Sequence, residues 1–205
     1  MNTKRTLIIP VVVVLALLIL APAVQGASPP TSLRELQTAD TGGAFVRLRD
    51  PGPLLWRDDF DGALQPEWTM VNENPGEWSL EVNPGFLTIW TSPAPTGEQN
   101  LLLRQAPAGD FSIQTRLLFT PSSNYEIAGL VMWQDPDNFL QFGRAFCDFP
   151  ENCVGNGIYF DLILDGTLTG ANFHTQVENL GEAHLRLIRQ GQSIRAYYSG
   201  NGFED

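Results

Sequence analysis

The acidic side chains are the first residues of this sequence that could carry out chemistry. Asp161 and Asp165 stand four positions apart in a segment that alternates like a β-strand, so they share a face at a separation of roughly 13 Å. Two carboxyl groups that act together in a retaining glycosidase lie about 5–5.5 Å apart. Asp165 also precedes a glycine, which is typical of a turn. The spacing therefore weakens a hydrolytic function, although folding can bring distant acids together.

Nucleophilic catalysis has no more support in the sequence. The chain has no Gly-x-Ser-x-Gly elbow of the kind that presents a nucleophilic serine. His174 falls in an expected loop and His184 in an expected strand, and neither lies beside a cysteine or serine motif. We expect both histidines to be polar surface residues or hydrogen-bonded structural residues.

Asp59 and Asp61 are the candidate metal ligands. At the end of a strand their side chains would point to one side, about 6–7 Å apart. Together with a backbone carbonyl and one more acid they could hold Ca²⁺, which takes six to eight oxygen ligands. The alternative is a solvated, turn-forming acidic edge that also includes Asp58.

Aromatic residues are the candidates for binding a sugar, because an apolar sugar face stacks on an aromatic ring while polar groups fix its orientation. We expect Trp133, Asn138 and Tyr159 to bind ligand, since Trp133 and Asn138 bracket a turn and can face a concave sheet. Weaker candidates of the same kind are Trp90, Phe139 and Phe173, with Gln141 and Arg144 as polar neighbours. The alternative for each ring is a place in the core, where most large aromatic residues lie.

Strands must position these side chains, because no apolar pattern of helical period lasts a useful length. Phe111, Ile113 and Thr115 alternate with polar residues, which predicts a half-buried strand. The run 127–133 is almost wholly apolar and predicts a central strand buried on both faces. Strands are expected near 55–60, 68–72, 77–82, 86–91, 100–105, 111–119, 126–133, 139–146, 157–164, 183–190 and 193–199. The predicted fold is all-β, with two antiparallel sheets packed as a jelly-roll sandwich.

The N-terminus resembles a secretory signal peptide over residues 1–26. Lys4 and Arg5 precede an apolar run, and small residues follow it. Cleavage is expected before Ala27, with a second acceptable site at Ala21 and Ala23; the alternative is an uncleaved membrane anchor. Residues 27–53 are rich in Pro, Ser, Thr and Gly and predict a linker, which leaves 54–205 as one domain.

The cysteines and the net charge indicate the compartment of the protein and the kind of partner it can bind. Cys147 and Cys153 are close in a chain that is expected to be exported, so we predict a disulfide between them. Two thiolates without a nearby histidine fall short of a zinc site.

The net charge of −11 would repel phosphate backbones, which argues against nucleic acid as a partner and leaves neutral ligands or cations.

An ordered set of short motifs resembles a known family. The set comprises Trp56–Asp61, Glu77–Leu80, Gly85–Ile89, Asn100–Arg104, Ala128–Trp133, Asp135–Phe139 and Tyr197–Ser199. Over about residues 55–205 it is similar to the concanavalin A-like module at the C-terminus of family 43 glycoside hydrolases (β-xylosidases) and to related secreted domains. The resemblance implies a two-sheet jelly roll, often non-catalytic and often attached to a polysaccharide-degrading enzyme. Relatives usually continue past residue 205 through further strands, so we expect a domain truncated at its C-terminus.

Three functions remain open after these observations. The first is a secreted, non-catalytic module that binds carbohydrate or supports polysaccharide degradation, with or without structural calcium at Asp59 and Asp61. The second is a glycoside hydrolase-like enzyme whose acids converge only in the fold, and the third is a structural cell-surface domain. A membrane contact is expected only if the signal segment is uncleaved.

Overall fold

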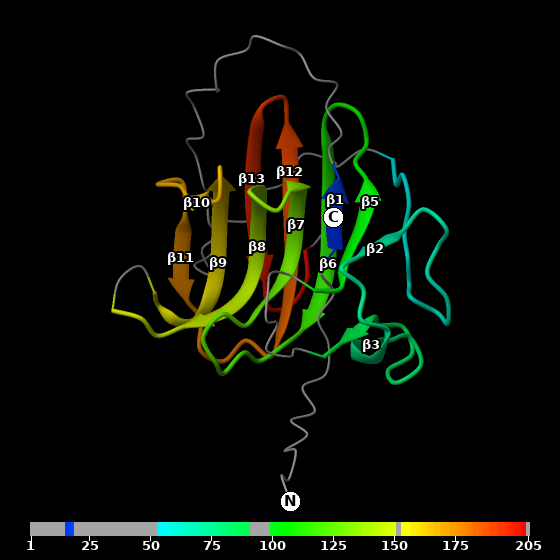
Figure 1. Ribbon diagram of the computed structural model, residues 1–205, viewed down its shortest axis with the longest axis horizontal. Coiled ribbons are helices and arrows are strands. Elements are labelled where there is room, and N and C mark those ends of the chain that lie inside the picture. The colour runs from blue at the N-terminus through cyan, green and yellow to red at the C-terminus, as the bar shows by residue number, and fades with distance from the viewer. Residues whose placement is uncertain (1–14, 19–52, 91–98, 151–152, 204–205) are drawn as a thin grey trace, which may run out of the picture.

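The computed structural model describes residues 53–90, 99–150 and 153–203 in full, and the backbone of residues 15–18. Most of the predicted signal peptide and nearly all of the predicted linker lie outside these residues. Strands make up almost all of the regular secondary structure in the described chain, and they lie in two facing layers (Figure 1), which confirms the predicted sandwich. No helix within these ranges is long and apolar enough to cross a membrane.

The larger sheet has eight strands in the order β10-β9-β8-β7-β1-β5-β2, with β11 also paired to β9. Its strands are β1 (Leu15–Leu18), β2 (Thr69–Val71), β5 (Leu101–Gln105), β7 (Ile127–Asp135), β8 (Asn138–Cys147), β9 (Gly155–Leu164), β10 (Thr167–Leu168) and β11 (Phe173–Gln176). Strands β7, β8 and β9 are consecutive antiparallel neighbours in this sheet, and a short turn joins β7 to β8.

The smaller sheet lies behind the larger one in Figure 1 and has the order β13-β12-β6. Its strands are β6 (Phe111–Leu118), β12 (Glu182–Gln190) and β13 (Ser193–Ser199). A short ribbon of β3 (Trp78–Ser79) and β4 (Thr88–Ile89) follows the 3₁₀ helix η1 (Pro75–Glu77) at one end of the sandwich. Asn74 caps η1 by accepting a hydrogen bond from the amide of Gly76.

The main core fills the space between the two sheets. Leu130, Phe142 and Phe160 from the larger sheet meet Leu185 and Leu187 from the smaller sheet in this cluster. Side chains alternate along a strand, so residues between these core positions point to the opposite, outer face of the larger sheet. A second apolar cluster lies there and comprises Leu101, Leu103, Val131 and Trp133. Strand β7 is therefore buried on both faces, as its apolar run predicts.

Strand β1 lies between β5 and β7 and runs parallel to both. Leu15 is in register with Leu102 on one side and Leu130 on the other. This strand falls within the segment predicted to be a signal peptide. Cleavage before Ala27 would remove it from the sheet, and that cleavage stays a prediction.

The predicted strand at 55–60 is wrong, because this segment is a loop. The carboxylate of Asp58 accepts hydrogen bonds from the amide of Phe60 at 2.9 Å and from Nε1 of Trp68 at 2.7 Å, which folds the chain back on itself. Phe60 takes a positive φ of 55°, which is incompatible with a strand. The sequence also missed β10 and β11, and the predicted loop at His174 is in fact part of β11.

Candidate ligand-binding face

The outer face of the larger sheet brings together the polar and aromatic residues that the sequence had only suggested separately. We use the name outer face for Val131, Trp133, Phe139, Gln141, Tyr159, Asp161 and His174. The register pairs Trp133 with Phe139 and Val131 with Gln141 across β7 and β8. Gln141 pairs with Asp161 across β8 and β9, and Tyr159 pairs with His174 across β9 and β11. Residues from four strands thus form adjacent rows on one face of the sheet, where Val131, Trp133, Tyr159 and Asp161 are buried.

A hydrogen-bonded polar row crosses the middle of this face. Asp161 accepts a hydrogen bond from Nε2 of Gln141 at 3.1 Å through Oδ2. Its Oδ1 lies 2.6 Å from Nε2 of His174. Asp161 is only 9% exposed, so its carboxyl oxygens need these hydrogen-bond partners in place of water. Asp161 and His174 were not predicted as site residues, because His174 reaches Asp161 only through the pairing of β11 with β9.

Aromatic rings border the polar row on both sides. Trp133 stacks on Phe139 with ring centroids 5.2 Å apart and planes inclined by 30°. On the other side Tyr159 lies against His174 at a centroid distance of 4.4 Å. Trp133 is 6% exposed, whereas Phe139, Gln141 and His174 are half-buried and form the more accessible part of the face.

Tyr159 holds its place through its hydroxyl group. The hydroxyl donates to the carbonyl of Gly155 at 2.8 Å and accepts from the amide of Val154 at 3.1 Å. Burial raises the pKa of Tyr159, and nearby Asp161 adds to the effect, while the hydrogen bond from Val154 opposes it. Tyr159 is therefore a neutral, fixed wall of the face.

A glycine pair forms the floor beside this wall. Gly129 of β7 is directly opposite Gly143 of β8. A Cβ at Gly143 would lie 2.0 Å from the carbonyl oxygen of Ala128, and one at Gly129 would lie 2.1 Å from that of Phe142. The two backbones approach too closely for any side chain, so both positions beside the polar row are restricted to glycine.

Asn138 occupies a turn rather than the face itself. Its side-chain Nδ2 donates to Oδ1 of Asp135 at 2.9 Å, and its Oδ1 accepts from the backbone amide of Asp165 at 3.1 Å. The side chain thus links the β7–β8 turn to the β9–β10 turn. The hydrogen bond from Asn138 is the main cause that lowers the pKa of Asp135. Of the three predicted ligand-binding residues, Trp133 and Tyr159 place their rings on the outer face, and Asn138 lies in the turn at the end of that face.

The remaining aromatic and polar candidates are distributed over other parts of the fold. Phe173 packs against the main core, and Arg144 is fully buried on the core side of β8. Trp90 follows β4, far along the chain from the polar row, and its backbone amide donates to the carbonyl of Glu77.

The predicted metal ligands lie in the loop before β2. Oδ1 of Asp59 forms an ion pair with Nη2 of Arg57 at 2.6 Å, and Asp61 is exposed. No group of three or more metal-ligating side chains occurs among the residues that the structure describes. Calcium binding at Asp59 and Asp61 stays a prediction.

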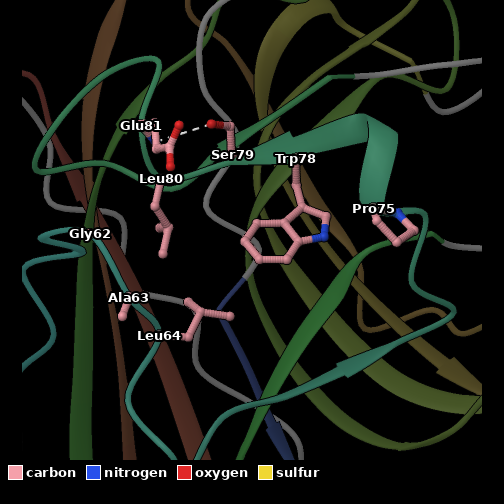
Figure 2. A pocket seen from close by; sticks show the side chains of 8 residues that line it. All are labelled: Gly62, Ala63, Leu64, Pro75, Trp78, Ser79, Leu80 and Glu81. Carbon is pink, nitrogen blue, oxygen red and sulfur yellow. Dashed lines mark hydrogen bonds between the residues drawn. The ribbon is translucent and has the colours of Figure 1, made fainter.

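A shallow depression of about 360 Å³ lies near the ribbon, between the loop at Gly62–Leu64 and β3. Figure 2 shows the indole of Trp78 and the side chains of Leu64 and Leu80 facing this space. Oγ of Ser79 accepts hydrogen bonds from the amides of Glu81 and Val82, at 3.0 and 3.3 Å. The depression offers apolar contact but few polar groups that converge on a ligand, so it is the weaker candidate.

The outer face combines polar and apolar groups. Asp161, Gln141 and His174 provide a carboxylate, an amide and an imidazole as directional donors and acceptors. The stacked rings of Trp133 and Phe139 provide an apolar surface beside them. Such a combination is typical of a ligand site.

The fold and this face together define the class of protein as a concanavalin A-like β-sandwich module. Residues 57–148 match the family model described as the beta xylosidase C-terminal concanavalin A-like domain, which confirms the resemblance seen in the sequence. The crystal structure of the GH43 BlXynB protein from Bacillus licheniformis is similar, with 27% sequence identity and a TM-score of 0.59. The match covers 72% of this chain and 29% of that chain, so the similarity concerns a module within a longer protein. No curated protein matches the chain significantly.

The predicted disulfide is also confirmed. Cys147 at the end of β8 is bonded to Cys153 just before β9, with Cα atoms 5.2 Å apart. The bridge closes the connection between the two strands that carry Gln141 and Asp161.

Proposed function

We propose that this chain is an exported, non-catalytic module that binds neutral carbohydrate through its outer face, as an accessory to polysaccharide degradation. The observation that carries the proposal is the row Gln141–Asp161–His174 beside the stacked Trp133 and Phe139. Sugar hydroxyl groups need directional donors and acceptors, while the apolar face of the sugar ring needs an aromatic surface.

The charge and the similarity to known proteins support the same ligand class. The net charge of −11 favours neutral ligands over anions. The matching family model describes a domain of β-xylosidases, whose action on plant polysaccharides makes xylan-type and arabinan-type sugars the first ligands to test. The disulfide and the signal-like N-terminus support export.

Titration calorimetry of the full chain with neutral xylo- and arabino-oligosaccharides tests the proposal. Asp161→Asn keeps the shape but weakens the acceptor, and we expect at least a tenfold loss of affinity, or about 1.4 kcal/mol. Asp165→Asn is the matched control, because the same change four residues further along falls in an exposed turn. A cooperatively folded wild type that binds no oligosaccharide would reject the proposal.

The same samples distinguish a hydrolase from a binding module. We expect no release of reducing sugar from xylan or arabinan over a long incubation. The glycosidase alternative would be established if the wild type and Asp165→Asn release reducing sugar and Asp161→Asn does not.

A further inference from the structure

Two exposed aromatic rings protrude from neighbouring loops at one end of the larger sheet. Tyr125, just before β7, is 84% exposed, and Phe149, just after β8, is 43% exposed. Their ring centroids are 5.5 Å apart, with planes inclined by 49°. The other aromatic side chains of the described residues are buried or half-buried. We call this pair the aromatic tip.

The loops that carry the tip are tied to each other. The carboxamide of Asn124 donates to Oδ1 of Asp148 and accepts from the amide of Asp148 at 2.8 Å. The carboxylate of Glu126 accepts from the amides of Ser122 and Ser123, at 2.7 and 3.1 Å. The disulfide between Cys147 and Cys153 closes the second loop around Phe149. The rings are therefore held in a fixed relation before any partner arrives, which lowers the entropic cost of binding.

The backbone of Tyr125 has a positive φ, which a bulky side chain rarely adopts. Its φ is +70°, and it stands third in a turn closed by a hydrogen bond from the amide of Glu126 to the carbonyl of Ser123 at 3.2 Å. This turn position favours glycine or asparagine. A bulky aromatic residue here costs stability, and an exposed ring recovers little of it through burial. An observed outlier of this kind motivates a hypothesis of function for the ring.

We propose that the aromatic tip is a second carbohydrate contact, which docks the module on the surface of a neutral, insoluble polysaccharide. The inference rests on the proposed function, but it uses a surface separate from the outer-face polar row. Two rings supply at most about 300–500 Å² of contact, whereas a stable protein interface needs about 800 Å² on each partner. The carboxylates of Asp148 and Glu126 beside the rings disfavour an acidic polymer.

Depletion of the full chain by insoluble neutral xylan tests the tip, and Tyr125→Gly is the most informative variant. Glycine removes the ring and relieves the positive φ. We expect retention on xylan to fall about fivefold or more, while the melting temperature stays equal to or above that of the wild type. Phe149→Ala should lower retention in the same direction. Leu168→Ala, which truncates a comparably exposed residue (44%) on β10, is the control and should leave retention unchanged.

Binding of a soluble xylo-oligosaccharide separates this proposal from the function on which it rests. Tyr125→Gly and Phe149→Ala should leave calorimetric affinity for the oligosaccharide unchanged, while Asp161→Asn lowers it. If both tip variants are retained on insoluble xylan like the wild type, the tip proposal is wrong and the outer-face proposal stands. If tip variants instead alter the oligomeric state in size-exclusion chromatography without altering retention, the tip contacts protein and the proposal is likewise overturned.

Reduction of the single disulfide gives an independent measurement on the unmodified chain. Cys147 and Cys153 are the only cysteines in the sequence, so a reductant acts on this bond alone. Opening the ring frees the loop that carries Phe149 and should lower retention on insoluble xylan, with little effect on oligosaccharide affinity. Equal retention before and after reduction, in a sample that remains folded, would contradict a preorganised tip.

Discussion

The guanidinium of Arg144 donates a hydrogen bond to the backbone carbonyl of Val177 inside the sandwich. Arg144 is 0% exposed, and its Nη2 also donates to the carbonyl of Glu178 at 3.3 Å. Burial lowers the pKa of Arg144. A buried cation thus fastens the segment between β11 and β12 to β8, and this anchors the strand that brings His174 to Asp161.

Replacement of Arg144 should therefore destabilise the fold. Arg144→Leu leaves two carbonyl groups without their donors, and although it also removes a buried charge, we expect a loss of about 1–3 kcal/mol in urea denaturation. Arg189→Leu is the matched control, because its Nε also donates to a backbone carbonyl, that of Gly191, but in an exposed position at the end of β12. The control should change stability by less than about 0.5 kcal/mol. Equal effects of the two variants would contradict the anchoring role of Arg144.

The glycine floor gives a second stability prediction. Gly143→Ala places a methyl group against the backbone of β7, with no flexible side chain that could yield. We expect a loss of about 3 kcal/mol or more, or failure to fold, at the upper end of overpacking effects. Gly181→Ala meets open space and should leave the melting temperature almost unchanged. A Gly143→Ala variant as stable as wild type would show that β7 and β8 are further apart in solution.

The pH dependence of stability should include a contribution from Glu182. Its carboxylate accepts two hydrogen bonds from Arg116, at 2.9 and 3.0 Å, and this is the main cause that lowers the pKa of Glu182. Because its folded pKa lies below the unfolded one, the ionised group stabilises the fold above the unfolded pKa. That contribution is lost as the pH falls through the lowered pKa. Between about pH 5 and pH 3 the melting temperature of wild type should fall more steeply than that of Glu182→Gln. Parallel curves for the two proteins would refute the assignment.

The position of β1 makes export and sheet formation depend on the same residues. If cleavage occurs before Ala27, the mature chain loses the strand that pairs with β5 and β7. The mass of the exported protein, measured by mass spectrometry, shows whether the chain has been cleaved before Ala27. In a cleaved chain we expect amides of residues 101–105 to exchange with deuterium faster than in the uncleaved chain, with β8 and β9 as an internal reference. Equal protection in both forms would mean that β1 contributes nothing to the sheet.

Calcium binding at Asp59 and Asp61 is tested by thermal denaturation. If these carboxylates hold the ion, millimolar Ca²⁺ raises the melting temperature by mass action, and Asp59→Asn removes the increase. The cation has to displace Arg57, which pairs with Asp59 in the structure. A melting temperature that is the same in Ca²⁺ and in EDTA would reject calcium binding at these two residues.

The sequence by itself determined the fold class and the positions of the long strands. Period-two alternation in 111–119 and the unbroken apolar run at 127–133 report which faces are buried, and both are local properties of consecutive residues. Two cysteines six residues apart likewise predicted their own bridge. The loop at 55–60 escaped this reasoning, because its conformation is set by Asp58 binding Trp68 ten residues away.

Only the tertiary structure decided which side chains meet on the outer face and at the tip. Gln141, Asp161 and His174 come from three strands, and their contact depends on sheet register and on the unpredicted strand β11, neither of which a local pattern records. Tyr125 and Phe149 belong to different loops, and they adjoin because Asn124 and Asp148 join those loops. Local patterns specify burial, whereas contacts between distant segments depend on how the strands pair.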